Sequence, residues 1–546
     1  MTTDRTDPTR TSVDGTVTGT ARAADPIGLI KTDGLGAGNF FRLAAAAASE
    51  TTETVIELDE PYRAPSGALH KRLSLSALDE LTDRVAAGYY ADGIRPKDPV
   101  AVFVTESVRY LLHYIALTKI GAIPVFVNSS LPPEIAARFI EHVGAAAVVS
   151  DPERLAEDRL PITYYSEEPY GQGAFKLFTH EDDDPVLIAH TSGTTGIPKA
   201  VQFNHMGFFF GVRQQIGADL GTRILSALPQ SHASAISVLM SAVARRATTL
   251  LATRRGPEDI ALAIQEFRPH LVAGFPKTFV DLCRVDLDAY DLSSVARWMS
   301  TGDANHERHI RKLVARGNHV DRDGNPQGGS LFIDNFGSSE FGFAMFRTVH
   351  TPTSDRYQRC IGRPFAWVEV EIFDADDEPV ANGTVGRLAL KSPTITGGYW
   401  NNSLLSEKNR IQGYWLTGDL AYRSEDGLYY HVDRTTDRIT TVNGVLYSAQ
   451  TEELILRHFP DLVDCSVVGV ESGDGGSDSQ EPVLTIDVPS SEAELADLRS
   501  RINALLAERG WPPVERVLVK GADEHVGVTG KALKRSMRVA FADTEG

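Results

Sequence analysis

A short segment, residues 190–199, contains the side chains that proteins use to hold a polyphosphate. Two glycines, four hydroxyl residues and a lysine follow the apolar run 185–189. They are Thr191, Ser192, Gly193, Thr194, Thr195, Gly196 and Lys199. Glycines let backbone N–H groups converge on an anion, hydroxyl groups add donors, and lysine adds positive charge. The glycine spacing is not that of a Walker A loop, so we interpret the segment as a different phosphate-binding loop. A solvated loop of the same composition is the alternative.

Three later segments combine glycine with charged or hydroxyl side chains. Residues 335–342 contain Ser339 and Glu340, residues 414–420 contain Asp419, and residues 528–535 contain Lys531. Each segment alone is typical of a turn or of a solvated basic patch. Together they offer carboxylates that can bind a divalent cation, a hydroxyl group that can donate to an anion, and a lysine that can neutralise phosphate charge.

In this order the segments resemble the motifs of the adenylate-forming superfamily, the AMP-dependent synthetases and ligases. This superfamily includes acyl-CoA synthetases, carrier-loading adenylation domains and luciferases, and the resemblance extends from about residue 75 to residue 537. It implies an enzyme that binds ATP and Mg²⁺. Asn335, Phe336 and Gly337 would belong to the nucleotide site, with Phe336 against the adenine. Ser339 would hydrogen-bond the α-phosphate or acyl oxygen, and Glu340 would bind Mg²⁺.

The resemblance also assigns roles to the remaining motif residues. Asp419 would accept hydrogen bonds from both ribose hydroxyls, and Arg434 would contact the ribose or the phosphates. Thr191 would join Glu340 as a ligand of Mg²⁺. Lys531 would bridge the carboxylate and α-phosphate oxygens from a mobile C-terminal domain, whose hinge would include Thr436.

Residues 437–444 resemble a hairpin that faces the active site after the C-terminal domain rotates. Gly444 would then line the tunnel for the pantetheine of CoA or of a carrier protein. The Pro-x-Glu that follows in the family is replaced here by residues 449–451, Ala-Gln-Thr, although Glu453 is retained. This departure concerns the part of the site that receives the acceptor, so it leaves the identity of the acceptor open.

Four residues are predicted to form the acyl pocket. His232 matches a histidine that gates this pocket in family members, although a lone histidine is also common in a protein core. Gly274 and Gly302 follow apolar stretches and would form further walls. Asp303 has two interpretations: it receives a hydroxyl or amine of the substrate, or it caps a helix predicted at 305–315. Ala233 and Ser234 stand where enzymes for α-amino acids place an aspartate, which argues against such a substrate.

The composition limits the class of protein. The chain has 546 residues and a formal charge of −19, which argues against binding to nucleic acid or to an anionic membrane surface. Three separated cysteines predict neither a disulfide framework nor a zinc site, and they favour the cytoplasm. We expect no membrane span, because no apolar run approaches about 18–20 residues.

Alternating apolar patterns predict an α/β fold. Helices are expected at 76–90, 107–119 and 132–143, and buried strands at 100–104, 123–127 and 146–150, as in parallel βαβ units. Shorter strands with glycine between them predict an antiparallel sheet or small β-barrel at about 360–432. We therefore expect a disordered tail (1–25), a large N-terminal domain of sheets sandwiched by helices (26–435), and a small, mobile α+β domain (437–546).

The sequence predicts an ATP-dependent acid–thiol ligase of the acyl-CoA synthetase type. Such an enzyme adenylates a small carboxylic acid, releases pyrophosphate, and transfers the acyl group to CoA or to a carrier phosphopantetheine. Two alternatives stay open. One is an adenylate-forming enzyme whose acceptor is not a thiol, such as an amine. The other is an inactive nucleotide-binding homologue. The sequence names neither the acid nor the oligomeric state.

Overall fold

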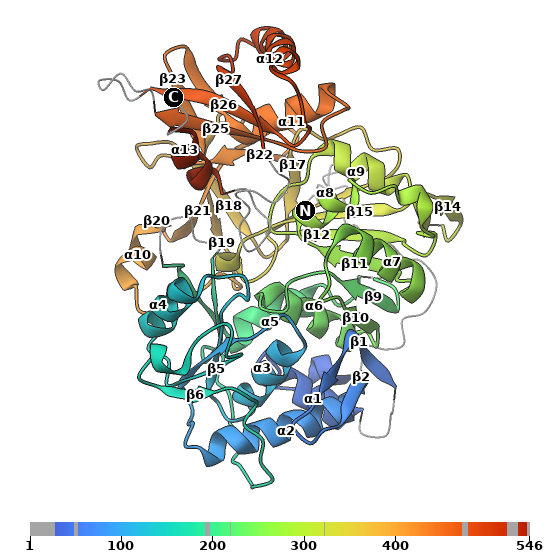
Figure 1. Ribbon diagram of the computed structural model, residues 1–546, viewed down its shortest axis with the longest axis vertical. Coiled ribbons are helices and arrows are strands. Elements are labelled where there is room, and N and C mark those ends of the chain that lie inside the picture. Colours follow the sequence, from blue (N-terminus) through green and yellow to red (C-terminus); the bar gives the residue numbers. More distant parts are fainter. Residues whose placement is uncertain are drawn as a thin grey trace, which may run out of the picture.

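Two sheets covered by helices form the large part of the molecule, and a smaller part packs at one end (Figure 1). The computed structural model describes residues 28–48, 53–191, 197–218, 220–321, 323–471, 479–520 and 533–542. The tail predicted for residues 1–25 lies outside these ranges. The mixed α/β fold predicted from the sequence is confirmed. No helix in the described ranges is long and apolar enough to cross a bilayer.

The first sheet has five parallel strands and an antiparallel edge strand. Its order is β6 (Thr163–Tyr165), β5 (Ala147–Ser150), β3 (Pro99–Phe103), β4 (Ile123–Phe126), β7 (Pro185–His190) and β8 (Ala200–Asn204). Helix α2 (Leu75–Ala91) precedes its first strand, and α3 (Arg109–Lys119) and α4 (Pro133–Val143) connect its strands. Strands β3, β4 and β5 are almost entirely apolar and buried, because packing covers both of their faces. The six elements predicted in this region are confirmed to within two residues at each end.

The second sheet joins a parallel half to an antiparallel half. The first half is β2 (Leu69–Ser74), β1 (Thr54–Arg63), β10 (Thr248–Leu251), β9 (Arg223–Ser226), β11 (Leu271–Gly274), β12 (Arg297–Thr301) and β15 (Leu331–Phe336), parallel except for β2. The antiparallel half is β16 (Phe346–His350), β17 (Cys360–Pro364), β22 (Tyr429–Arg434), β21 (Tyr414–Arg423), β19 (Gly386–Lys391) and β18 (Glu369–Phe373). Helices of the large part also include α1 (Phe40–Ala47), α5 (His205–Gln214), α6 (Ala233–Ala244), α7 (Pro257–Phe267), α8 (Pro276–Leu282), α9 (Glu307–Val314) and α10 (Ser403–Lys408).

The antiparallel character predicted for residues 360–432 is confirmed, and these strands continue the large sheet through the β16–β17 pair. No strand pair in the described chain closes them into a barrel, so the barrel stays a prediction. The junction of the two halves matters for the site. There β15 pairs with the parallel strand β12 on one side and with the antiparallel strand β16 on the other.

Residues from 438 onward have a hydrophobic core of their own, in which Ile455, Val467 and Leu484 are fully buried. Their elements are β23 (Arg438–Thr441), β24 (Gly444–Tyr447), α11 (Ser448–His458), β25 (Cys465–Glu471), β26 (Gln480–Ile486), α12 (Glu492–Ala507), β27 (Arg516–Val519) and α13 (Lys534–Ala542). This part contacts α9 of the large part, since His306 Nδ1 lies 2.7 Å from Glu453 Oε2. The domain boundary near residue 435 and the mobility of this part stay predictions.

Candidate active site

A cavity of about 420 Å³ lies at the carboxyl ends of β12 and β15, where the two halves of the large sheet meet. Ligands of open α/β sheets commonly bind at such strand ends. The predicted site residues on its wall are Thr191, Lys199, His232, Gly302, Asp303, Asn335, Phe336, Gly337, Ser339, Glu340, Asp419 and Arg434. Segments that are far apart in the sequence therefore share one cavity.

Other predicted site residues are not on this wall. Residues Ser192 to Gly196, and Lys531, lie outside the described residues. Gly274 ends β11 and is not part of the wall, whereas its neighbour Phe275 is. Gly444 lies at the turn between β23 and β24, exposed and with φ +119°. The described structure therefore does not bring the hairpin of Gly444 to the cavity.

Lys199, Tyr399 and Glu340 form a contact chain across the phosphate-loop side of the cavity. The Tyr399 hydroxyl donates to Glu340 Oε1 at 3.0 Å, and Lys199 Nζ lies 3.5 Å from the same hydroxyl. The Ser338 hydroxyl donates to the other Glu340 oxygen at 3.0 Å. Burial, with the neighbouring Glu340 charge, raises the pKa of Tyr399 well above its ordinary value, so the hydroxyl remains a donor. The arrangement holds one carboxylate and one ammonium group on the same part of the cavity wall.

Glu340 is the carboxylate predicted to bind Mg²⁺, and it lies on the cavity wall. Within the described ranges no group of three or more His, Cys, Asp or Glu side chains gathers as a complete metal site. Mg²⁺ is commonly bound through one or two carboxylates, with phosphates and water as its other ligands. A single carboxylate on the cavity wall fits this chemistry, and binding of Mg²⁺ by Glu340 stays a prediction.

Asp419 and Arg434 are brought together by strand register. They are directly paired across β21 and β22, and Arg434 Nε lies 3.9 Å from Asp419 Oδ1. His431 Nε2 lies 3.3 Å from the same carboxylate oxygen. Burial raises the pKa of Asp419, but the His431 hydrogen bond and the charges of His431 and Arg434 outweigh it and hold this pKa below its ordinary value. The result is a buried anionic acceptor, as a ribose diol requires.

Asp303 follows β12 and lies on the cavity wall. Its Oδ1 accepts a hydrogen bond from the Ala304 backbone at 2.9 Å and lies 3.4 Å from Arg359 Nη2. The helix-cap interpretation is wrong, because α9 begins at Glu307 and His306 is its N-cap residue. The Asp303 carboxylate instead faces the arginine of the neighbouring antiparallel half. Its contact with a substrate stays a prediction.

His232 is the N-cap residue of α6 and contacts Phe275 edge to face, with ring centroids 4.9 Å apart. The loop before it is fixed by Glu106, which accepts hydrogen bonds from the Gln230 backbone at 2.7 Å and the Ser231 hydroxyl at 2.5 Å. Both contacts come from a segment more than a hundred positions earlier in the sequence.

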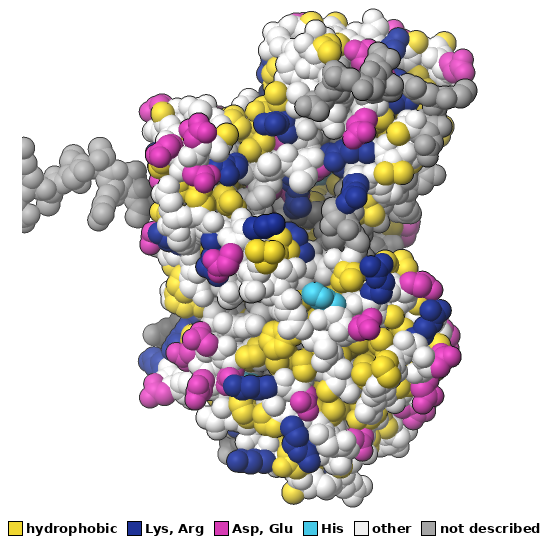
Figure 2. All heavy atoms as spheres, turned by 90° about the vertical axis from the view of Figure 1, so that its left-hand side faces the viewer, with side chains coloured by type: hydrophobic (Ala, Val, Ile, Leu, Met, Phe, Trp, Pro, Cys, Tyr) yellow, Lys and Arg dark blue, Asp and Glu magenta, His cyan; other side chains and the backbone are white. Residues whose placement is uncertain are grey.

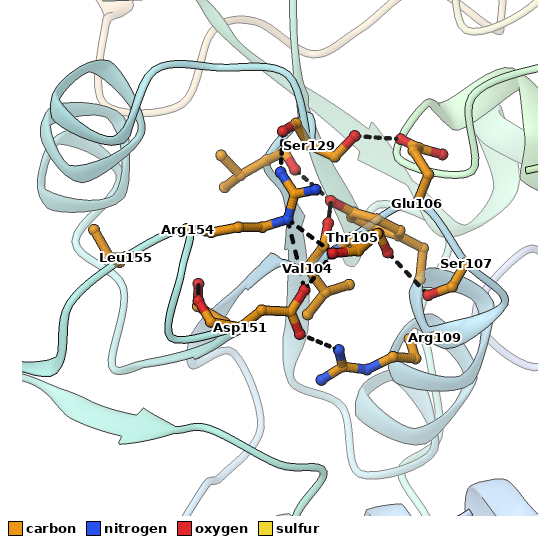
Figure 3. A network of polar contacts seen from close by, with 12 residues as sticks. Val104, Thr105, Glu106, Ser107, Arg109, Ser129, Asp151, Arg154 and Leu155 are labelled. Atoms are coloured by element: carbon orange, nitrogen blue, oxygen red, sulfur yellow. Dashed lines mark hydrogen bonds and ion pairs between the residues drawn. The ribbon is translucent and has the colours of Figure 1, made fainter. Parts of the chain in front are cut away.

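Glu106 belongs to a polar network at the carboxyl ends of β3, β4 and β5 (Figure 3). Asp151, after β5, accepts hydrogen bonds from the Thr105 backbone and hydroxyl, and Arg109 binds the other Asp151 oxygen. Ser129, after β4, donates to Glu106 at 3.1 Å. The first sheet thus positions the loop of His232, although it contributes little of the cavity wall itself.

Tyr399 and Arg347 lie on the wall and His431 lies beside Asp419, and none of the three was predicted from the sequence. Tyr399 follows Gly397 and Gly398, a pattern typical of an ordinary turn, so the sequence gives no signal for its contact with Glu340. His431 reaches Asp419 only because β21 and β22 pair in one register. Arg347 on β16 is paired with Asn335 on β15, and only this strand pairing places Arg347 on the wall.

Local positive charge offsets the acidic composition near the site. Four cations, Lys199, Arg245, Arg347 and Arg434, line the cavity with three carboxylates, Asp303, Glu340 and Asp419, whereas the chain as a whole carries −19. On the face drawn in Figure 2, Lys and Arg side chains also gather near the middle. A cavity with several cations suits anionic ligands such as a nucleotide.

Comparison with known proteins places the chain in a family. The family model described as "AMP-binding enzyme" matches residues 47–400. The 3-aminoavenalumate diazotase of a Streptomyces species is 39% identical over 541 residues, which cover 94% of this chain and 97% of the relative. The 3-amino-2-hydroxy-4-methoxybenzoate diazotase of Streptomyces cremeus is 25% identical over 492 residues, which cover 81% and 85% of the two chains.

A solved anthranilate CoA ligase in complex with anthranoyl-AMP has the same fold, with a TM-score of 0.77. It is 19% identical, and the match covers 92% of this chain and 97% of that one. The chain belongs to the AMP-binding enzyme family, the AMP-dependent synthetases and ligases. It is therefore an adenylate-forming enzyme, as its motifs predicted.

Proposed function

We propose that this enzyme is an ATP-dependent diazotase that activates nitrite and transfers its nitrogen to the amine of an aromatic substrate. The observation that carries the proposal is the 39% identity to a diazotase, which spans both chains almost from end to end. This replaces the thiol acceptor that the sequence analysis placed first. It develops the alternative in which the acceptor is an amine.

The first step follows the chemistry of the family with nitrite in place of a carboxylate. An oxygen of nitrite attacks the α-phosphorus of ATP, the bond to pyrophosphate breaks, and a nitrosyl–AMP anhydride forms. Lys199 and Arg434 would neutralise phosphate charge, and Asp419 would hold the ribose. Mg²⁺ held by Glu340 would neutralise charge on the triphosphate when bound.

The second step consumes the anhydride. The aryl amine attacks the nitrosyl nitrogen, the N–O bond to AMP breaks, and an N-nitroso amine remains. One amine proton is released in this attack. The tautomer of the N-nitroso amine, a diazohydroxide, takes up one proton and loses water to give the aryl diazonium ion. That water contains one nitrite oxygen, while the other oxygen leaves on AMP. The amine and nitrite nitrogens supply all the redox change, so no other oxidant or reductant is needed.

The cavity supports this proposal because the nucleotide residues and the rest of the wall enclose one continuous space. An amine bound beside His232 and Asp303 could reach an anhydride held between Lys199 and Asp419. Asp303 also offers a carboxylate that accepts a proton or a hydrogen bond from an aromatic amine.

An acid–thiol ligase is the second candidate, and one observation favours it. Gly444 is exposed at its hairpin turn with φ +119°, a conformation that suits glycine and leaves the turn free to approach the cavity after a domain rotation. In that function a carboxylate of the substrate, and not nitrite, would attack ATP.

Both candidates are tested with the full chain, ATP and Mg²⁺ at pH 8, where nitrite does not diazotise amines unaided. Pyrophosphate release is measured with 3-aminocinnamate, with and without nitrite, and separately with CoA instead of nitrite. Diazonium is trapped by azo coupling to a naphthylamine dye. We expect release and azo dye only when nitrite and the amine are both present. CoA-dependent AMP release without nitrite would establish the ligase and reject the diazotase.

A further inference from the structure

The cavity extends well beyond the nucleotide residues, along one side of α6. His232 at the start of this helix and Arg245 just after its end both line the wall, with Ser237 and Ser241 between them. The helix has 12 residues, so this wall is about 18 Å long at 1.5 Å per residue. The space can therefore hold an elongated acceptor whose two ends meet different side chains.

Arg347 lies on the wall of this cavity and has no acidic partner among the described residues. Its Nε donates to Asn335 Oδ1 at 2.9 Å, and its Nη1 donates to Gln215 Oε1 at 2.5 Å. Both acceptors are neutral amides, and Nη2 has no hydrogen-bond partner within the described part of the chain. No carboxylate in these ranges forms an ion pair with this guanidinium. Burial lowers the pKa of Arg347 to about 10, so the side chain is still cationic at neutral pH.

The other arginines near the nucleotide end either lie beside a carboxylate or already donate from every guanidinium nitrogen. Arg434 lies 3.9 Å from Asp419, and Arg359 lies 3.4 Å from Asp303. Arg245, which shares the acceptor wall, donates to the backbone carbonyls of Ala218 at 3.0 Å and Ser241 at 2.8 Å. A partly buried cation without a counter-ion is costly unless a ligand supplies the negative charge. Among the described residues, Arg347 is therefore the arginine of this wall that keeps an N–H group for an anion, whereas Lys199 contacts Tyr399 at the nucleotide end.

We infer that Arg347 binds a carboxylate of the acceptor substrate and so turns the amine of that substrate toward the nucleotide. The inference rests on the proposed diazotase function and names its substrate class, an aryl amine that also carries a carboxylate. A guanidinium can bind both carboxylate oxygens in a planar pair, which fixes orientation as well as affinity. With its carboxylate at Arg347, the substrate does not present that group to the α-phosphorus.

Binding is measured by calorimetry on the full chain, without ATP or nitrite, using 3-aminocinnamate and its methyl ester. We expect the acid to bind at least ten-fold more tightly than the ester. Arg347→Gln should weaken binding of the acid at least ten-fold and change binding of the ester less than three-fold, and Arg347→Lys should give an intermediate loss. Arg363→Gln is the matched control. This exposed arginine is paired with Arg347 across β16 and β17 but is not part of the cavity wall.

Two results would overturn the inference. The first is equal affinity of the wild-type enzyme for the acid and its ester, which would exclude a contact with the substrate carboxylate. This result requires no variant. The second is an equal loss of affinity for the acid and the ester in Arg347→Gln. It would show that Arg347 only holds Gln215 and Asn335 in place through its hydrogen bonds. Failure of the Arg347 anchor can be distinguished from failure of the proposed diazotase function. Equal turnover of acid and ester with nitrite would reject the anchor alone, and Arg347-dependent binding without nitrite-dependent turnover would reject the diazotase alone.

Discussion

Asp334 provides a quantitative test of the structure beneath the active site. This residue lies on β15, fully enclosed, and accepts hydrogen bonds from the backbone and side-chain amides of Asn305. Burial raises the pKa of Asp334 from 3.8 to about 7, and the negative charge of Asp303 adds a smaller increase. The Asn305 hydrogen bonds and the positive charge of Arg359 lower this pKa but do not outweigh burial. The unfolded chain loses this proton near pH 4, whereas the folded protein keeps it until about pH 7. Folding is therefore favoured by Asp334 at low pH, and that advantage is lost as the pH rises from 4 to 7.

We expect Asp334→Asn to remove this loss. At 1.36 kcal/mol per pKa unit, a rise from 3.8 to about 7 corresponds to about 4 kcal/mol. The amide substitution is nearly isosteric, and Asn305 Oδ1, which has no partner in the described structure, can accept a hydrogen bond from the new amide after a side-chain flip. For a cooperative unit of about 400 residues, 1 kcal/mol changes Tm by about 1 °C. Only about 2 of these pKa units lie above pH 5, so the variant should melt about 3 °C higher than the wild type at pH 8, relative to their difference at pH 5.

Differential scanning calorimetry at one scan rate, from pH 5 to pH 8, measures this difference. Asp376→Asn is the matched control, since it makes the same substitution at an exposed position. Its curve should remain parallel to that of the wild type. If the curves of Asp334→Asn and wild type are also parallel, Asp334 titrates like an exposed carboxyl, and the packing around Asn305 is not as described.

Three further substitutions test the nucleotide end. Tyr399→Phe removes the hydroxyl between Lys199 and Glu340. Because one hydrogen bond is lost, we expect pyrophosphate release up to about ten-fold slower and a higher Mg²⁺ requirement. An unchanged Mg²⁺ titration would contradict this. Asp419→Ala should weaken binding of AMP at least about ten-fold in calorimetry because a charged acceptor disappears, and equal affinity would remove Asp419 from the ribose site. Lys531→Ala should slow pyrophosphate release by about 10² or more while sparing reaction of a supplied adenylate; equal loss in both steps would refute its role.

Much of the fold was predictable because apolar periodicity directly reflects burial. Strands β3, β4 and β5 are covered on both faces, so their sequences are nearly uninterrupted apolar runs. The motif residues could be recognised by their chemistry and spacing, and the fold brings Lys199, Glu340 and Asp419 to one cavity. Their individual roles stay predictions, as does the role of Lys531.

The remaining features depend on pairings that a sequence does not display. Arg347 meets Asn335 because β15 and β16 pair in one register, and a shift by one residue would turn its side chain to the other face. The sequence left two interpretations of Asp303, a substrate contact and a helix cap. A residue in either role can follow a strand and precede a helix, so the sequence pattern does not distinguish them. The acceptor was not predictable from the motifs, since they define the nucleotide half that different members of the family share.

The central claim is that nitrite attacks the α-phosphorus of ATP, and isotope transfer tests it most directly. The enzyme is incubated with ATP, Mg²⁺, 3-aminocinnamate and nitrite labelled with ¹⁸O at both oxygens, and the AMP formed is analysed by mass spectrometry. Our account predicts AMP that carries one ¹⁸O atom, because one nitrite oxygen leaves on the phosphate. Unlabelled AMP from labelled nitrite, together with ¹⁸O-labelled AMP from a carboxylate-labelled substrate, would show that the enzyme activates the acid and would contradict the account.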